Sequence, residues 1–215
     1  MAQVLVIGAH GKIALLAERL LVEEGHAVTG VVRNPDHADD VRATGASVTV
    51  SDVENLDTAG ITDLVSGFDA VVWSAGAGGG SPERTYAVDR DAAIRTVDAA
   101  AGAGVQHLVM VSYFGAGPDH GVSPDNGFFT YAEAKSAADA HLEAAPVPWT
   151  ILRPSTLTDG PEGGITTDDT EGREVPRATV ARVIASVVTE RAASTGRIIT
   201  FNEGDQDVAR VVAGA

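Results

Sequence analysis

Residues 3–7, Gln-Val-Leu-Val-Ile, run directly into residues 8–14, Gly-Ala-His-Gly-Lys-Ile-Ala, and these two stretches decide the fold. The first is apolar and rich in β-branched side chains, which predicts a strand buried on both faces. Residues 15–24 have the spacing of an amphipathic helix, and residues 27–32 predict a second strand. The side of the helix expected to face the sheet carries Leu16, Leu20 and Leu21. Strand, glycine turn, helix and strand form a βαβ unit.

The glycine turn has the residue types that a dinucleotide-binding turn requires. Gly8 permits the tight bend, Gly11 lets the backbone approach a pyrophosphate, and Ala14 is small enough for close packing of helix and strand. The free N–H groups at the start of the helix would face the anion. The pattern G-x-x-G-x-x-A differs from the G-x-G-x-x-G of dehydrogenases, and an ordinary βα turn without a ligand is the alternative. Its place between a strand and a helix favours the binding turn.

Composition narrows the classes of function. The chain has 215 residues, a hydrophobic content of 44% and a net charge of −15, so we expect one domain that repels nucleic acid and anionic membranes. It has no cysteine, which excludes disulfides and thiol catalysis. No apolar run reaches the roughly 20 residues of a membrane span, and the apolar N-terminal run is a strand rather than a signal peptide. A cytoplasmic protein is expected, as a monomer or homodimer with a small-molecule substrate and no metal.

Strands and helices alternate along the rest of the chain. This order predicts an α/β fold: a Rossmann-like, doubly wound parallel β-sheet flanked by helices, in a single domain over residues 1–215. We expect residues 1–153 to be the cofactor-binding core and residues 154–215 a small part that contributes to the substrate cleft. Two polar, glycine-rich stretches, 115–127 and 156–172, are expected to be mobile loops beside that cleft. The further strands are predicted at 46–50, 68–73, 106–111, 149–152 and 197–201, and the further helices at 56–66, 82–103, 129–144 and 176–191, with a weak helix at the end.

The second and third strand ends carry candidate contacts to an adenosine. In a dinucleotide fold, an arginine at the end of the second strand accommodates the 2′-phosphate of NADP, so Arg33 favours NADP(H) over NAD(H). Asp36 lies close by and argues the other way, and a solvated arginine is the simpler alternative. Asp52 is placed to meet the adenine amino group, with Val53 against the ring. Asp52 could equally cap the helix that begins near Leu56.

The fourth strand ends in small residues. Ser74, Ala75 and Gly76 would let a cofactor lie close to the backbone at the carboxyl end of a parallel strand. Gly78 to Gly80 continue this stretch, either as part of the same cofactor loop or as a flexible loop.

Ser112, Tyr131 and Lys135 form the sharpest chemical pattern. Tyr131 and Lys135 lie one turn apart on one face of a predicted helix. A tyrosine can exchange a proton with a substrate oxygen, and a neighbouring lysine favours its phenolate, whose unperturbed pKa is about 10. Ser112 stands at the end of the fifth strand, where its hydroxyl could hold a substrate carbonyl. The alternative is a packed tyrosine and a solvated lysine.

The chain resembles the atypical short-chain dehydrogenases/reductases. It is similar to small NAD(P)H-binding proteins related to NAD-dependent epimerases/dehydratases, and more distantly to biliverdin reductase B and NmrA-like proteins. The resemblance covers nearly the whole chain through the stretches GAHGKIA, VVRN, SDV, WSAGAG, VMVSYFG, YAEAK and WTILRPSTLTDGP.

The resemblance implies roles for individual residues. It implies Arg33 at the adenosine phosphate, Asp52 and Val53 at adenine, and Ser112, Tyr131 and Lys135 as the catalytic set, with Lys135 also bonding the nicotinamide ribose. The residues that it places around the pyrophosphate, along the cofactor and near the nicotinamide are Gly8, His10, Gly11, Lys12, Ile13, Ser74, Ala75, Gly76, Arg153 and Pro154. Extended family members carry a large substrate domain after the sixth strand, and residues 155–215 are too few for a second core of typical size.

Three functions are compatible with these residues. The first is an NADP-dependent oxidoreductase that passes a hydride between the cofactor and a small carbonyl or alcohol, with Tyr131 as acid or base. The second is an epimerase or dehydratase with a retained cofactor. The third is a non-catalytic NADPH-binding redox sensor, as in NmrA-like proteins.

Overall fold

The computed structural model describes residues 1–77 and 81–214, so the expectation for Gly78 to Gly80 lies outside the described residues. An eight-stranded sheet runs through the centre of the molecule in the order β3-β2-β1-β4-β5-β6-β10-β8. Its first seven strands are parallel, and β8 pairs antiparallel with β10 at the edge. This arrangement confirms the Rossmann-like, doubly wound fold. The strands are β1 (Gln3–Ile7), β2 (Ala27–Val32), β3 (Ser47–Val50), β4 (Ala70–Trp73), β5 (His107–Val111), β6 (Trp149–Pro154), β8 (Gly164–Thr166) and β10 (Arg197–Gly204).

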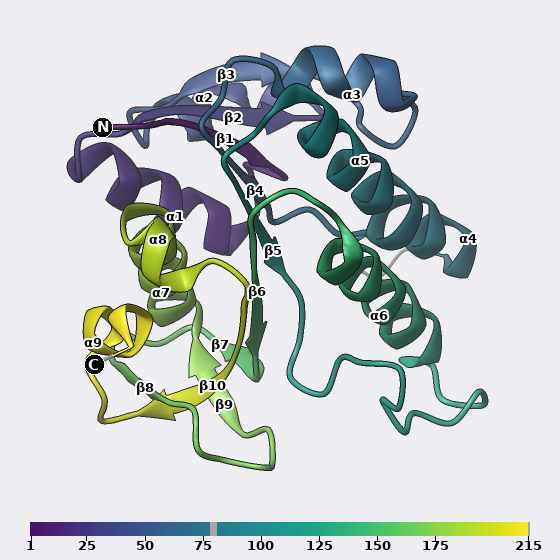
Figure 1. Cartoon of the computed structure of the whole chain (residues 1–215), viewed down its shortest axis with the longest axis vertical. Coiled ribbons are helices and arrows are strands. Elements are labelled where there is room, and N and C mark those ends of the chain that lie inside the picture. The colour runs from purple at the N-terminus through teal and green to yellow at the C-terminus, as the bar shows by residue number, and fades with distance from the viewer. Residues whose placement is uncertain (78–80, 215) are drawn as a thin grey trace.

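Helices cover both faces of the sheet (Figure 1). On one face α1 (Lys12–Glu23) packs against α7 (Arg177–Thr189), and α9 (Val208–Ala213) packs on α7. On the other face α3 (Thr58–Val65), α5 (Ala93–Ala103) and α6 (Phe129–Ala144) lie side by side. Each face has its own apolar core against the sheet. The shorter helices are α2 (Ala38–Arg42), α4 (Pro82–Thr85) and α8 (Arg191–Ser194), with a 3₁₀ turn at Pro35–His37.

The opening strand and helix form where the sequence predicts them, with one error of detail. Val4 to Ile7 are fully buried between the two layers of helices, as a doubly covered strand requires. The buried face of α1 is carried by Ile13, Ala14, Ala17, Glu18 and Leu21. The expected leucine face is wrong at Leu16, which is exposed, because the small alanines let α1 lie closer to the sheet than a leucine would.

The structure corrects two further points. The stretch 156–172, predicted to lack regular structure, contains two short strands: β7 (Thr156–Thr158) pairs with β9 (Glu174–Pro176), and β8 joins the main sheet. Of the two alternatives for Asp52, the helix cap is wrong. Asp52 does not cap α3, because Asp57 does so by accepting a hydrogen bond from the N–H of Gly60 at 2.8 Å. The helix predicted over 82–103 is continuous, and its residues Tyr86–Ala92 are π-helical, which the sequence did not indicate.

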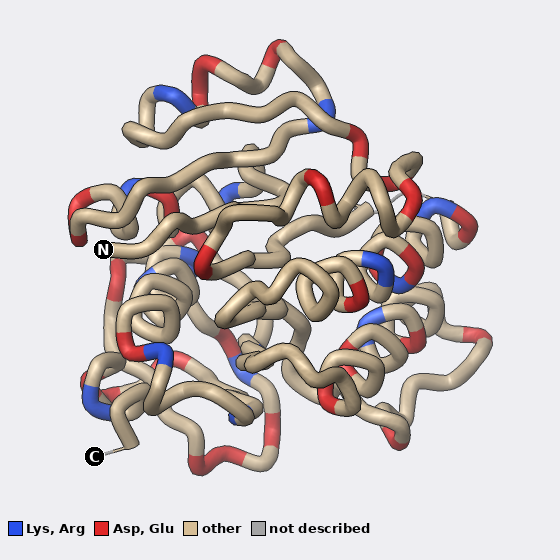
Figure 2. Tube along the Cα trace, turned by 45° about the horizontal axis from the view of Figure 1, so that its top comes forward, with Lys and Arg blue, Asp and Glu red and all other residues tan. Residues whose placement is uncertain are grey.

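Strands β1 to β5 carry no Asp, Glu, Lys or Arg, and the charged positions lie mostly on helices and loops (Figure 2). Acidic residues outnumber basic ones, 30 to 15. Within residues 1–77 and 81–214 no helix combines the length and the apolar character that crossing a membrane requires.

Glu18 is a buried acid in the middle of the apolar face of α1. Its Oε2 lies 3.4 Å from the hydroxyl of Thr44, and its Oε1 has no hydrogen-bond partner among the described residues. Burial is the main cause that raises its pKa from 4.5 to about 8, and the Thr44 hydroxyl opposes this only in part. Glu18 is therefore held as the neutral acid at neutral pH.

We expect Glu18→Gln to stabilise the protein at alkaline pH. The folded pKa lies above the unfolded value, so the contribution of the neutral acid is fully present below pH 4.5 and is lost as the pH rises through about 8. Glutamine cannot ionise, so the free energy of unfolding at pH 8 should rise by up to about 4 kcal/mol and change little at pH 4.5. Urea denaturation at the two pH values measures this. Glu23→Gln, on the exposed face of α1, should give no such difference.

Candidate functional site

The turn between β1 and α1 lies against the end of β4. Gly8 has a φ of +87°, and a Cβ placed on it would come within 2.6 Å of the Ala75 backbone. Only glycine fits both conditions. The N–H of Gly11 donates to the carbonyl of Gly8 at 3.0 Å, and α1 begins at Lys12. The first N–H groups of α1 have no partner within the helix and point out of the turn, which suits an anion.

A cavity of about 460 Å³ opens beside this turn, at the carboxyl ends of β1 to β4. Its size is that of a cofactor pocket. Of the residues predicted to bind the cofactor, nine line it: Gly8, His10, Gly11, Arg33, Asp52, Val53, Ser74, Ala75 and Gly76. Together with the glycine cradle and the helix N-terminus, these residues fit the adenosine and diphosphate parts of a dinucleotide.

Two arginines contact one carboxylate at the end of the cavity away from the Gly8 turn. Nη1 of Arg33 lies 3.4 Å from Oε2 of Glu54, and Nε of Arg84 lies 3.3 Å from the same oxygen. Nη1 of Arg84 also donates to the carbonyl of Ala77 at 2.7 Å. Arg33 lines the cavity and Asp36 does not. Sequence reasoning missed Arg84 and Glu54, because only the fold brings α4 to the end of β3.

A pair of stacked histidines closes the side of the cavity between β1 and β2. The rings of His10 and His37 lie 3.7 Å apart, almost parallel. Nε2 of His10 contacts Oδ2 of Asp40 at 2.8 Å. His37 and Asn34 are lining residues that the sequence did not single out.

Lys12 and Ile13 do not line the cavity with their side chains. The exposed Lys12 ammonium lies 3.2 Å from Oδ2 of Asp159, a carboxylate that also pairs with Arg177 at 2.6 Å. Ile13 is buried in the core beneath α1. If Ile13 contacts a pyrophosphate as predicted, its backbone N–H must make the contact, because its side chain is buried.

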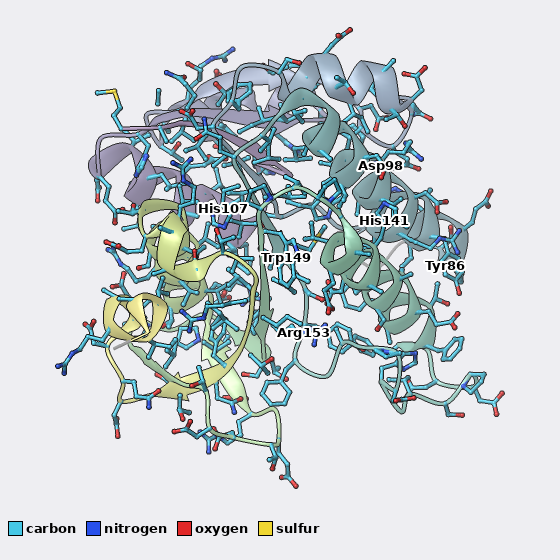
Figure 3. All side chains as sticks on the ribbon, in the orientation of Figure 1. Tyr86, Asp98, His107, His141, Trp149 and Arg153 are labelled. Atoms are coloured by element: carbon cyan, nitrogen blue, oxygen red, sulfur yellow. The ribbon has the colours of Figure 1, made fainter. Side chains whose placement is uncertain are left out.

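The predicted catalytic residues gather at the carboxyl end of β5, around a residue that sequence reasoning missed. Ser112 is buried there, and its hydroxyl donates to Oδ2 of Asp139 at 2.8 Å. Arg153, labelled in Figure 3, lies near the end of β6. Its Nε donates to the same oxygen of Asp139 at 3.1 Å. One face of α6 carries Tyr131, Lys135 and Asp139 at successive turns. The helical spacing that indicated the first two residues could therefore have indicated Asp139 as well.

Asp89 connects this cluster to the cavity. It lies in the π-helical stretch before α5, and its carboxylate accepts a hydrogen bond from the N–H of Ala77 at 2.9 Å. A Cβ on Gly76 would come within 3.0 Å of its Oδ1, so glycine is what allows Asp89 to approach this loop. The stretch 86–92 packs on α6, on the side of Lys135.

Lys135 and Tyr131 are in an environment of two buried carboxylates. Burial lowers the pKa of Lys135, of which 1% is exposed, and Asp89 and Asp139 oppose this. Burial raises the pKa of Tyr131, and the same two carboxylates raise it further. The expectation that this site favours the phenolate is therefore wrong. Without a cofactor, Tyr131 is a protonated phenol throughout the neutral range, and its raised pKa makes it a weaker proton donor than an ordinary tyrosine.

Arg153 and Pro154 lie outside the cavity. The Arg153 side chain is mostly buried between the sheet and α6, where it also approaches Glu143 at 3.7 Å. Pro154 ends β6, and its carbonyl accepts a hydrogen bond from the N–H of Phe114 at 2.8 Å. They border the Ser112 cluster rather than the adenosine end.

The glycine turn, the cavity and the Ser112 cluster all fall within residues 8–191, which match the family described as NAD(P)H-binding. The chain belongs to this NAD(P)H-binding family. The match confirms the resemblance that the sequence motifs indicated.

Individual relatives agree with this assignment. A protein of Schizosaccharomyces pombe is 35% identical over 173 residues, 72% of this chain and 70% of the relative. An uncharacterised sugar epimerase of Bacillus subtilis, YhfK, is 29% identical over 214 residues, 98% of each chain. The solved structure of a Bacillus halodurans protein, provisionally named an NAD-dependent epimerase/dehydratase, is 31% identical, covers 100% of both chains and superposes with a TM-score of 0.91.

We expect Gly8→Ala to damage the turn between β1 and α1 far more than its backbone angle alone explains. Gly25→Ala is the matched control, because Gly25 has a φ of +86° and no atom within 4 Å of an added Cβ. The control should cost about 1–2 kcal/mol in the free energy of unfolding, from left-handed strain alone. The clash with Ala75 should add about 1–3 kcal/mol at Gly8 and weaken NADPH binding. Equal losses in the two variants, with NADPH affinity intact, would refute the role of this close approach.

Proposed function

We propose that the protein is an NADP(H)-dependent oxidoreductase that acts on a small carbonyl or alcohol. The observation that carries this proposal is the juxtaposition of Ser112 with Tyr131 and Lys135, joined through Asp89 to the loop that lines the cofactor cavity. When bound, NADP(H) supplies or accepts a hydride. The protein would hold the cofactor, orient the substrate oxygen and donate or accept the proton.

Each group has one task in this reaction. The Gly8 turn and the start of α1 would hold the diphosphate, and Arg33 the 2′-phosphate. Tyr131 would donate its proton to the oxygen of a carbonyl during reduction. Lys135 would bond the nicotinamide ribose. We infer that residues 154–215 contribute to the substrate cleft, and that the protein works in the cytoplasm as a monomer or homodimer.

Aromatic side chains beside Tyr131 suggest which carbonyl compounds to try first. The rings of Tyr113 and Phe128 lie 5.7 and 5.2 Å from that of Tyr131, and Phe128 is exposed. Such a wall favours substrates with an apolar or aromatic part next to the carbonyl. Aldehydes, ketones and quinones of this kind should be followed by NADPH absorbance.

The names of two relatives favour a second candidate, an epimerase or dehydratase that keeps its cofactor through the cycle. This function would be supported by cofactor that stays bound through gel filtration and by turnover without net change in NADPH. Tight NADPH binding without turnover of any substrate would favour the sensor instead.

We expect Arg33→Ala to weaken NADPH binding by about 10- to 150-fold and to leave NADH binding nearly unchanged. The lost charge-assisted contact to phosphate is worth about 1.5–3 kcal/mol. Fluorescence titration of both cofactors measures the two affinities. Arg19→Ala, on the exposed side of α1, controls for the loss of one positive charge. Equal wild-type affinities for NADPH and NADH would refute the preference.

We expect Tyr131→Phe to lower turnover by about 10²–10⁴-fold while NADPH affinity changes little, because the variant loses the proton donor alone. Tyr86→Phe is the matched control, since the Tyr86 hydroxyl bonds Glu133 on the exposed surface. Steady-state rates and cofactor titration give both quantities. Full activity in Tyr131→Phe would mean that water or another group supplies the proton.

A further inference from the structure

The hydrogen bond between Ser112 and Asp139 restricts what Ser112 can do. A hydroxyl has one hydrogen, and an ionised carboxylate can only accept. Ser112 donates that hydrogen to Oδ2 of Asp139 at 2.8 Å. With Asp139 ionised, the serine oxygen therefore meets a substrate only as an acceptor, and it cannot hold a carbonyl oxygen.

Asp139 is itself fully buried among groups from four elements. On its own helix, Lys135 lies one turn before it, Tyr131 two turns before it and Glu143 one turn after it. From β6, Arg153 donates to its Oδ2, while its Oδ1 has no partner among the described residues. At the end of β5 it contacts Ser112 and lies near Tyr113, and Asp89 lies on the π-helical stretch that packs against the same helix.

We propose that Asp139 is a positioning residue that decides whether Ser112 can donate a hydrogen bond to a substrate carbonyl. The inference rests on the proposed oxidoreductase function. When Asp139 carries a proton, that proton can fill the bond between the two residues, and the Ser112 hydrogen is free to turn to a carbonyl. When Asp139 is ionised, Ser112 instead accepts a hydrogen bond from the hydroxyl of an alcohol.

The surroundings allow Asp139 to change its charge. Burial raises its pKa, whereas Lys135, the Ser112 hydroxyl and Arg153 lower it. Carbonyl binding should then be strongest on the acid side of the Asp139 titration and weaken as the pH rises through it. The protonated form of Asp139 suits reduction, because Ser112 and Tyr131 can then both donate a hydrogen bond to the carbonyl oxygen of the substrate.

The first test separates substrate binding from chemistry. With NADPH and an aromatic aldehyde as the probe, the wild-type KM should rise about three- to tenfold across the titration of Asp139, the worth of one hydrogen bond. In Asp139→Asn residue 139 no longer titrates, so KM should be independent of pH whichever way the amide is turned. A KM that follows the wild-type pH profile in this variant would overturn the proposal.

The second test needs neither cofactor nor substrate. The ¹³Cγ signals of aspartates are titrated by NMR in the cofactor-free protein, and the Asp139 signal is assigned by its disappearance in Asp139→Asn or Asp139→Glu. Ser112→Ala removes a hydrogen bond that favours the ionised form, so the Asp139 titration should move to higher pH. Ser136→Ala, on the same helix, should leave it in place.

The two proposals fail in different ways. If Ser112→Ala does not move the Asp139 titration, the coupling of Ser112 to Asp139 is refuted whatever the enzyme does. If the titration moves but the wild type turns over no carbonyl probe, the coupling stands and the oxidoreductase function is refuted.

Discussion

The close approach of Gly8 to the backbone of Ala75 is the constraint on which the site depends. The strand order reverses at β1, because β2 and β3 lie on one side of it and β4 and β5 on the other. A crevice opens at such a reversal, beyond the carboxyl ends of the strands. Gly8 leaves β1 and Ala75 leaves β4 at this point, and their contact fixes how far apart the walls of the crevice stand. This spacing would let the first N–H groups of α1 meet the diphosphate of the proposed cofactor.

The second constraint is electrostatic, because the protein buries charge beside the crevice. Two basic side chains, Lys135 and Arg153, lie close to two acidic side chains, Asp89 and Asp139. Removing any one of these groups would leave a charge without compensation, which is more costly than the intact cluster. The cluster joins β5, β6, α6 and the π-helical stretch, so the arrangement of the reactive residues is fixed by the same elements that form the core.

Local patterns explain how much the sequence could predict. The turn at Gly8 and the pair Tyr131 and Lys135 are contiguous motifs, so both could be located from the sequence alone. Arg84 and Asp89 could not, because they reach the site through the sheet order and the π-helical register. The three-residue strands in 156–172 are too short to show a period. The position of Leu16 was predicted wrongly because Ala14 and Ala17 face the sheet in α1, which turns Leu16 away from it.

The π-helical stretch has a consequence for the whole helix from 82 to 103. All of its buried positions except Ala99 repeat every four residues, in two rows: Thr85, Asp89, Ala93 and Val97, and Val88, Ala92, Thr96 and Ala100. In a regular α-helix a step of four residues overshoots a turn by roughly 40°, so such rows would wind around the axis and leave the core after a few turns. The wider turns over Tyr86–Ala92 absorb this drift. The buried side of the helix therefore stays on the core from Asp89, which bonds the N–H of Ala77 beside the cavity, to Val97.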